Sequence, residues 1–290
     1  MAEDKYEKLT FADDFMFGKI MAYHENLCRE LLEMILGVKI NHIRYIEPQK
    51  HVKITPDGKG VRFDVYVDDD QHSVYDIEMQ AVPRSNLPKR SRYYGSMMDL
   101  NMIEHGADYK ELSRSYVIFI CKFNPFGGER HFYTFTNICA EERDIFLKDG
   151  TSKIFLCTKG KADDISEEMS TFLQYLMNGK PENTFTKSLD AVVCAARKNK
   201  EWRMEYMTME MALKEKMDEG KQQGIKQGIK QGIKQGIKQG ERQGRKRGIK
   251  QGALNVAEKM IKRNMPISEI RDLTGISEAD ILKLKKEMDR

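Results

Sequence analysis

Two short runs decide the fold of this chain: Arg62-Phe63-Asp64-Val65-Tyr66-Val67 and Val74-Tyr75-Asp76-Ile77-Glu78-Met79-Gln80. Each run alternates apolar and polar residues with period two, which is typical of a half-buried β-strand. The segment between them, 68–73, is polar and turn-forming, so the pair predicts a β-hairpin. A turn centred on Gln71 places Asp64 directly opposite Glu78, with their β-carbons roughly 5 Å apart.

Three polar side chains of this hairpin share one face. Asp64 and Glu78 repel each other as carboxylates unless a cation lies between them. Gln80 projects from the same face as Glu78, because side chains two residues apart on a strand point the same way. Such oxygen ligands suit Mg²⁺, so the hairpin predicts a metal centre that cleaves phosphodiester bonds. Asp76 also shares this face, but its more peripheral place predicts that it is solvated. A second interpretation, a plain solvated acidic sheet face, stays open.

Composition excludes several other kinds of protein. The five cysteines of the 290-residue chain are scattered and form no C-x-x-C pair, which argues against a disulfide scaffold and against a zinc site. No phosphate-binding or dinucleotide-binding glycine motif is present, so we expect no nucleotide cofactor. The acidic start of the chain predicts no signal peptide, and no apolar run is long enough to span a membrane. These features together indicate a cytoplasmic protein.

The net charge of +4 is distributed unevenly along the chain. Residues 220–252 hold ten Lys or Arg and one acid, while residues 253–290 carry a net charge of +1, so residues 1–219 carry −6. We expect the basic segment to contact DNA, while the acidic body lacks an obvious basic cleft. The lysines of the repeated unit are the candidate phosphate contacts: Lys226, Lys230, Lys234 and Lys238.

The basic segment is a repeat with glycine at every fourth position from 220 to 252, mostly in the unit Gly-Ile-Lys-Gln. Four residues of an ideal helix advance 400°, so each repeat would turn the glycine stripe by about 40°. Each glycine also costs roughly 1 kcal/mol relative to alanine in a helix. Two interpretations stay open: a partly helical spacer, and a helix stabilised by self-association.

The remaining pattern predicts a mixed α/β core followed by helices. We expect a helix over 25–37 ended by Gly37, a helix over 88–104 ended by Gly106, and strands at 40–45, 51–55, 116–121, 132–135 and 153–156. A turn is expected at 56–58, and residues 163–219 are expected to be helical, with Met177 on their apolar face. Two short amphipathic helices, the second capped by Ser277, end the chain. This predicts four domains: a core 1–160, a helical extension 161–219, a repeat spacer 220–252 and a C-terminal helical unit 253–290. The extension or the C-terminal unit is the expected interface of a homodimer; a docking or dimerising role of the C-terminal unit is favoured over DNA reading.

Several motifs resemble those of one known family. Arg62-Phe63-Asp64-Val65 and Ile77-Glu78-Met79-Gln80 look like its second- and third-strand motifs, and Asp14-Phe15-Met16-Phe17 looks like its opening Asp-x-x-Phe. Segments 92–94 and 106–112 resemble the helix that follows and the entry into the next strand. Over most of residues 9–290 the chain is similar to the bacterial recombination-promoting nuclease and transposase family of the PD-(D/E)XK superfamily. Gly18 departs from the pattern, because the family often has Lys there.

The resemblance implies a restriction-endonuclease-like mixed sheet flanked by helices, and Mg²⁺-dependent DNA cleavage that promotes recombination. Asp64, Glu78 and the main-chain carbonyl of Met79 would hold the metal. Gln80 stands where the superfamily usually has Lys; it would orient water or phosphate, since an amide carries no charge. A further carboxylate would come from the first helical segments, with Asp14 favoured over Glu30 and Glu33. Two arginines are candidate DNA contacts. Arg62 would bind a DNA phosphate or form an ion pair with Asp64, and Arg92 would contact the scissile strand. The alternative is an inert DNA-binding or oligomerising protein that keeps the nuclease fold.

Overall fold

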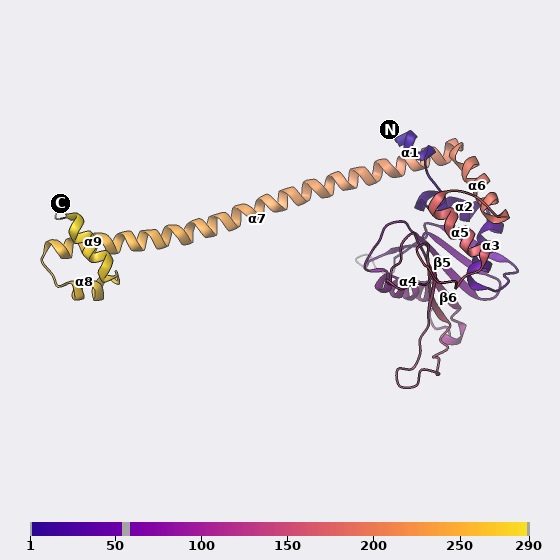
Figure 1. The fold of residues 1–290 in the computed structure, drawn as a ribbon, viewed down its shortest axis with the longest axis horizontal. Coiled ribbons are helices and arrows are strands. Elements are labelled where there is room, and N and C mark those ends of the chain that lie inside the picture. The colour runs from indigo at the N-terminus through magenta and orange to yellow at the C-terminus, as the bar shows by residue number, and fades with distance from the viewer. Residues whose placement is uncertain (1, 54–58, 289–290) are drawn as a thin grey trace. The chain divides into compact units, whose positions relative to one another are not determined.

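The computed structural model describes residues 2–53 and 59–288 of the chain (Figure 1). It divides into two compact units, 1–210 and 211–290. The four-domain division made from the sequence stays a prediction, and the predicted turn at 56–58 lies outside the described residues. None of the described helices is both long enough and apolar enough to cross a membrane.

The first unit is built on a six-stranded mixed sheet with strand order β1-β4-β5-β6-β8-β7. The strands are β1 (Ile43–Pro48), β4 (Val65–Asp69), β5 (Ser73–Gln80), β6 (Arg114–Cys121), β7 (Phe132–Phe135) and β8 (Thr151–Cys157). β5, β6 and β8 run parallel, while β1, β4 and β7 pair antiparallel with their neighbours. The almost wholly apolar strand β6 lies inside the sheet, as its sequence predicts. This arrangement confirms the predicted mixed sheet.

The β4–β5 hairpin has the register that the sequence predicts. Val65 pairs with Ile77 and Asp68 with Val74, which is the register centred on residue 71. The ladder ends at Val65, one position before Asp64 would pair with Glu78. The run 62–67 is not one strand, however. Val61–Arg62 forms β3, which pairs with β2 (His51–Val52) in a separate two-stranded ladder. The chain turns at 63–64, where the Phe63 N–H donates to the Lys50 carbonyl (3.0 Å) and the Asp64 carbonyl accepts from the Gln49 N–H (2.9 Å).

Two apolar layers cover the sheet. One face packs against α1 (Ala2–Glu7), α2 (Asp14–Tyr23), α3 (Glu25–Leu36), α5 (Glu167–Asn178) and α6 (Thr184–Arg197) through Val65, Ile77 and Ile118, among others. The other face packs against α4 (Leu87–Met102) through side chains such as Val74 and Phe119. Because successive strand side chains alternate between faces, Asp76, Glu78 and Gln80 all point to the α4 side.

The helices agree with the sequence predictions except at two points, the end of α4 and the position of Met177. α3 ends at Gly37, whose φ of 68° is the left-handed conformation that glycine adopts without strain. α4 ends at Met102, before Gly106, and the short 3₁₀ helix η1 (Tyr109–Glu111) leads into β6. Residues 163–219 contain α5, α6 and the start of α7, as predicted, but Met177 is 46% exposed and lies off their apolar face.

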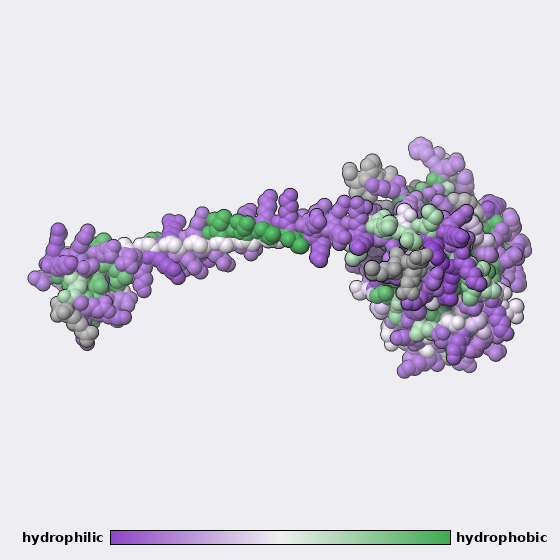
Figure 2. Space-filling model, turned by 90° about the horizontal axis from the view of Figure 1, so that it is seen from above, coloured by the Kyte–Doolittle hydropathy of each residue, from purple (hydrophilic) through white to green (hydrophobic). Residues whose placement is uncertain are grey.

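The repeat is helical along its whole length. α7 runs without a break from Lys200 to Lys262, so the partly helical interpretation is wrong for this segment. A β-carbon added at any glycine from 220 to 252 would meet nothing within 4 Å outside the helix backbone. Figure 2 shows the pale line of glycines beside a row of isoleucines, of which Ile225, Ile229, Ile233 and Ile237 are 55–59% exposed. Self-association through this surface stays a prediction.

The C-terminal unit has its own small core. The last turns of α7, α8 (Ile267–Thr274) and α9 (Glu278–Met288) enclose five buried side chains: Ala257, Ile261, Ile270, Ile276 and Ile281. Gly275 ends α8 with a φ of 68°. Ser277 caps α9, because its Oγ accepts the Asp280 N–H at 3.2 Å. The two predicted helices and the cap are confirmed, and the end of α7 completes a three-helix cluster.

Candidate active site

Asp64 and Glu78 are joined where β4 meets β5. The Asp64 N–H donates to Glu78 Oε1 at 3.0 Å, and the Met79 N–H donates to Asp64 Oδ2 at 3.2 Å. These reciprocal bonds form because the chain leaves the ladder at Asp64, which frees its backbone N–H for a side chain. Asp64 is 6% exposed and Glu78 is fully buried. The Gln80 amide donates to the Met79 carbonyl at 3.0 Å, so the four residues form one hydrogen-bonded group.

Arg90 of α4 reaches this group from the opposite layer. Its Nη2 forms a close ion pair with Glu78 Oε2, and its Nη1 donates to Gln80 Oε1 at 3.2 Å. Its Nε donates to the Tyr94 hydroxyl at 2.8 Å, and the guanidinium lies 4.8 Å from the centre of the Tyr94 ring. Each of the three guanidinium nitrogens therefore makes a hydrogen bond, and the positive charge lies beside Glu78 and Gln80 of the predicted site.

Asp76 is not solvated, which corrects the sequence prediction. Its side chain is fully buried, and no N–H or O–H group of the described residues donates to either carboxylate oxygen. The Glu78 carboxyl group lies within hydrogen-bond reach, where a protonated Asp76 can donate to it. Burial raises the pKa of Asp76 well above its ordinary value, and the charges of Glu78 and Asp64 raise it further. The prediction fails because α4 covers this face of the sheet, which the pattern of β5 alone does not reveal.

The site holds more carboxyl groups than one arginine can neutralise. Burial raises the pKa of Asp64 to about 6, with a contribution from the charge of Asp14. Burial raises the pKa of Glu78 to about 8, with a contribution from Asp64. Burial opposes the charge of Arg90, but Glu78 and Tyr94 outweigh it, and the pKa of the guanidinium is raised. Another cation at the site would therefore stabilise the ionised carboxylates.

The site opens into a basic cavity of about 540 Å³. Asp14, at the start of α2, lines it together with Asp64 and Gln80. Desolvation in the cavity raises the pKa of Asp14 although much of its side chain is exposed. Five cationic side chains line the same cavity: Lys59, Arg62, Arg84, Lys89 and Arg90. The expectation that the acidic body has no basic cleft is wrong, because these residues gather locally from β3, from the segment before it, and from the start of α4.

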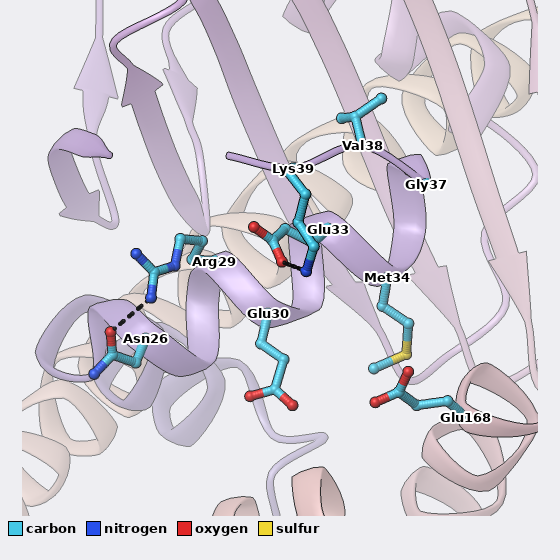
Figure 3. Close-up of a pocket in the computed structure, with 9 residues that line it drawn as sticks. All are labelled: Asn26, Arg29, Glu30, Glu33, Met34, Gly37, Val38, Lys39 and Glu168. Carbon is cyan, nitrogen blue, oxygen red and sulfur yellow. Dashed lines mark hydrogen bonds and ion pairs between the residues drawn. The ribbon is translucent and has the colours of Figure 1, made fainter. Parts of the chain in front are cut away.

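The two alternatives to Asp14 lie elsewhere. Glu30 and Glu33 line a second cavity of about 470 Å³ beside α3, which Glu168 of α5 closes on one side (Figure 3). Lys39 Nζ donates to Glu33 Oε2 at 2.7 Å, and the Ile40 N–H donates to Glu33 Oε1 at 2.9 Å. Neither glutamate lines the cavity of the candidate active site.

The two predicted arginines differ in position. Arg62 is exposed and lines the cavity, whereas Arg92 is exposed on α4 and does not line it. Arg90 is the residue that the sequence analysis missed. The spacing of residues in the sequence could have identified it. Leu87, Arg90 and Tyr94 are three and four residues apart, so they share the face of α4 that packs on the sheet.

The donor set suits a divalent metal ion of the hard, oxygen-binding type. Asp64 Oδ1 accepts no hydrogen bond from the described residues, and Asp64 lines the cavity. The buried Asp76 lies behind it and packs against the Glu78 carboxyl group. Within residues 2–53 and 59–288 no cluster of three or more His, Cys, Asp or Glu side chains is arranged to hold a metal, so two carboxylates and a carbonyl are the available protein ligands.

Comparison with known proteins gives one match. A family model described as PD-(D/E)XK nuclease family transposase matches residues 11–222, which is most of the chain. The matched range includes Asp14, Asp64, Glu78 and Gln80, and it ends at the start of the repeat. No curated protein and no solved structure matches the chain.

Proposed function

Since the chain belongs to the PD-(D/E)XK nuclease family transposases, we propose that it is a Mg²⁺-dependent DNA endonuclease that promotes recombination. The observation that carries this proposal is that hydrogen bonds join Asp64 to Glu78 and to Met79 beside a cavity lined by five cationic side chains. Oxygen ligands recruit a divalent metal, and the cations attract the phosphates of DNA. The family's description as transposases supports the role in recombination.

Each member of the site has a separate task. Asp64 and Glu78 hold the metal, and the carbonyl of Met79 is a further ligand. The bound metal would lower the pKa of an attacking water and offset charge on the phosphate. Gln80, which cannot carry charge, orients that water or a phosphate oxygen through its amide. Asp14 faces the same cavity and supplies a further carboxylate.

Cationic side chains around the cavity would hold the DNA backbone. Arg62 and Lys59 lie on the β3 side of the cavity, while Arg84 and Lys89 lie beside the start of α4. Phosphate contacts of this kind position a duplex without reading its sequence. Arg92 would contact DNA only outside the cavity, because it does not line it.

The decisive experiment is cleavage of supercoiled plasmid with Mg²⁺ by the native protein, Asp64→Asn and Glu78→Gln. We expect both variants to lose cleavage while keeping their fold, because each loses a charged ligand but little volume. Asp144→Asn, on an exposed loop, is the matched control and should cleave normally. Cleavage that persists in both variants would refute the site. Plasmid binding without cleavage by the native protein would favour the inert DNA-binding alternative.

The repeat supplies DNA affinity in this proposal. Lys226, Lys230, Lys234 and Lys238 are all exposed on α7, about 6 Å apart along the helix axis. Replacing the four by Gln should lower the slope of log affinity against log salt by roughly 3 to 4, if each contacts one phosphate. Replacing them by Arg keeps the charge and should leave the slope unchanged. An unchanged slope in the Gln variant would exclude the repeat as a DNA contact.

We also propose a homodimer formed through the helical extension or the C-terminal unit. In the extension, Met204, Met211, Leu213 and Met217 are exposed apolar side chains on α7, and covering such side chains in a dimer gains free energy. Sedimentation of the full chain tests this: a dimer is expected, and a monomer at all concentrations would refute it.

A further inference from the structure

Arg90 separates Glu78 from the cavity. Asp64, Gln80 and Arg90 all line the cavity, but Glu78 does not, and its side chain has no exposed surface. The Arg90 side chain keeps 19% of its surface exposed. The Glu78 oxygen that could meet a metal in the cavity, Oε2, is therefore the one that Arg90 occupies.

The position of Arg90 does not depend on Glu78 alone. Its Nε bonds to the Tyr94 hydroxyl at 2.8 Å, and its guanidinium lies 4.8 Å from the Tyr94 ring centre and 5.5 Å from that of Phe119. Aromatic faces attract cations, so the Tyr94 and Phe119 rings favour a guanidinium beside them even when its Nη2 no longer contacts Glu78.

The charges favour such a change. Asp64 and Glu78, which are joined by a hydrogen bond, share the guanidinium of Arg90, which brings a single positive charge. A divalent ion brings two charges to the same group, and a buried carboxylate gains most from the partner that neutralises it best.

We propose that Arg90 and the divalent metal ion are alternative partners of Glu78, so that metal binding displaces the guanidinium into the cavity. The proposal rests on the proposed function only in requiring that the site binds a metal. The displaced guanidinium remains among Lys59, Arg62 and Arg84, where phosphate oxygens of DNA would bind it bidentately. Arg90 then provides the positive charge at the phosphate that Gln80 cannot provide.

The test is calorimetric titration of Mg²⁺ into the full chain, comparing the native protein with Arg90→Met and Arg90→Lys. Met keeps the apolar stem and removes the charge. We expect Arg90→Met to bind Mg²⁺ about tenfold more tightly, because a charge-assisted hydrogen bond no longer has to break first. Arg90→Lys should fall between the two. Arg92→Met, on the exposed side of the same helix, is the control and should match the native protein.

Equal or weaker Mg²⁺ binding by a folded Arg90→Met would overturn the proposal, and so would the absence of Mg²⁺ binding from both native protein and variant. If Arg90→Met does not fold, the native protein still gives an answer. The NMR signal of the Arg90 guanidinium, assigned with Arg90→Lys, should shift when Mg²⁺ saturates the site. An unchanged signal at saturation would refute the exchange.

The plasmid assay separates this proposal from the proposed function. Tighter Mg²⁺ binding by Arg90→Met in a protein that never cleaves DNA would leave the exchange standing and refute the nuclease. Cleavage by the native protein, with unchanged Mg²⁺ affinity in Arg90→Met, would support the nuclease and refute the exchange of partners.

Discussion

Replacing Asp76 by Asn should change how the stability of the metal-free protein depends on pH. Asp76 is fully buried, no donor of the described residues reaches its carboxylate, and burial together with the neighbouring Glu78 raises its pKa well above the ordinary value. A carboxyl group with a raised pKa stays protonated in the folded chain after it has ionised in the unfolded chain. The folded state then binds more protons, so the free energy of unfolding falls as pH rises from about 4 toward the folded pKa.

The magnitude follows from the linkage between protonation and folding. Each pH unit over which Asp76 is protonated only in the folded state lowers the free energy of unfolding by about 1.4 kcal/mol. Between pH 4 and 6 the group therefore removes up to about 3 kcal/mol. Asn keeps the size of the side chain and does not titrate. Asp64 and Glu78 have raised pKa values too, and their contribution has the same sign in both proteins.

Urea unfolding at pH 4.5, 5.5 and 6.5 without metal measures the effect. Trp202, the only tryptophan of the chain, is buried in the core of the first unit and reports its unfolding by fluorescence. We expect the stability of Asp76→Asn relative to the native protein to grow with pH, by at most about 1.4 kcal/mol for each pH unit below the folded pKa of Asp76. The exposed control Asp144→Asn should follow the native protein. A difference that does not grow with pH would show that Asp76 is ionised in the folded chain, contrary to the raised pKa that its burial implies.

Three further predictions follow from other parts of the molecule. Ile281→Ala empties a fully buried position of the C-terminal unit and should cost about 2–5 kcal/mol there; unchanged hydrogen exchange in α8 and α9 would contradict it. Gly232→Ala and Gly236→Ala should each stabilise α7 by about 1 kcal/mol, since the added methyl groups meet nothing within 4 Å. Circular dichroism should show that the double variant keeps more helix on heating; a loss of helix would indicate that the glycine face packs against another chain. Mg²⁺ affinity should rise from pH 6 to 8, because the pKa of Asp64 is raised to about 6 and that of Glu78 to about 8, so metal binding must release protons. Calorimetry in buffers of different ionisation enthalpy counts the protons released, and a count of zero would refute this.

Local sequence pattern was sufficient for the hairpin. The period-two alternation and the turn centred on Gln71 place Asp64 opposite Glu78, as the register of β4 and β5 confirms. Such patterns carry this information because register depends on residues close in sequence. The family motifs then lead to the same residues and to the mixed sheet.

Features that depend on distant segments were not accessible in this way. Asp76 is buried because α4 covers its face, and the bend at Phe63 arises from backbone bonds to residues 49 and 50. The choice between Arg90 and Arg92 depends on how α4 is turned on the sheet. The repeat was undecided because glycine propensity argues against a helix, which α7 nevertheless forms throughout.

The regularity of α7 has a consequence at the level of the gene. One Gly-Ile-Lys-Gln unit corresponds to four codons, so replication slippage within the repeat removes or adds whole units without a frameshift. Each unit gained lengthens the helix by about 6 Å, rotates its last residue by about 40° and adds one lysine. Since the glycines from 220 to 252 contact nothing beyond their own helix, such a change breaks no packing. The segment can therefore change in discrete steps of length, rotation and charge while the first unit stays the same.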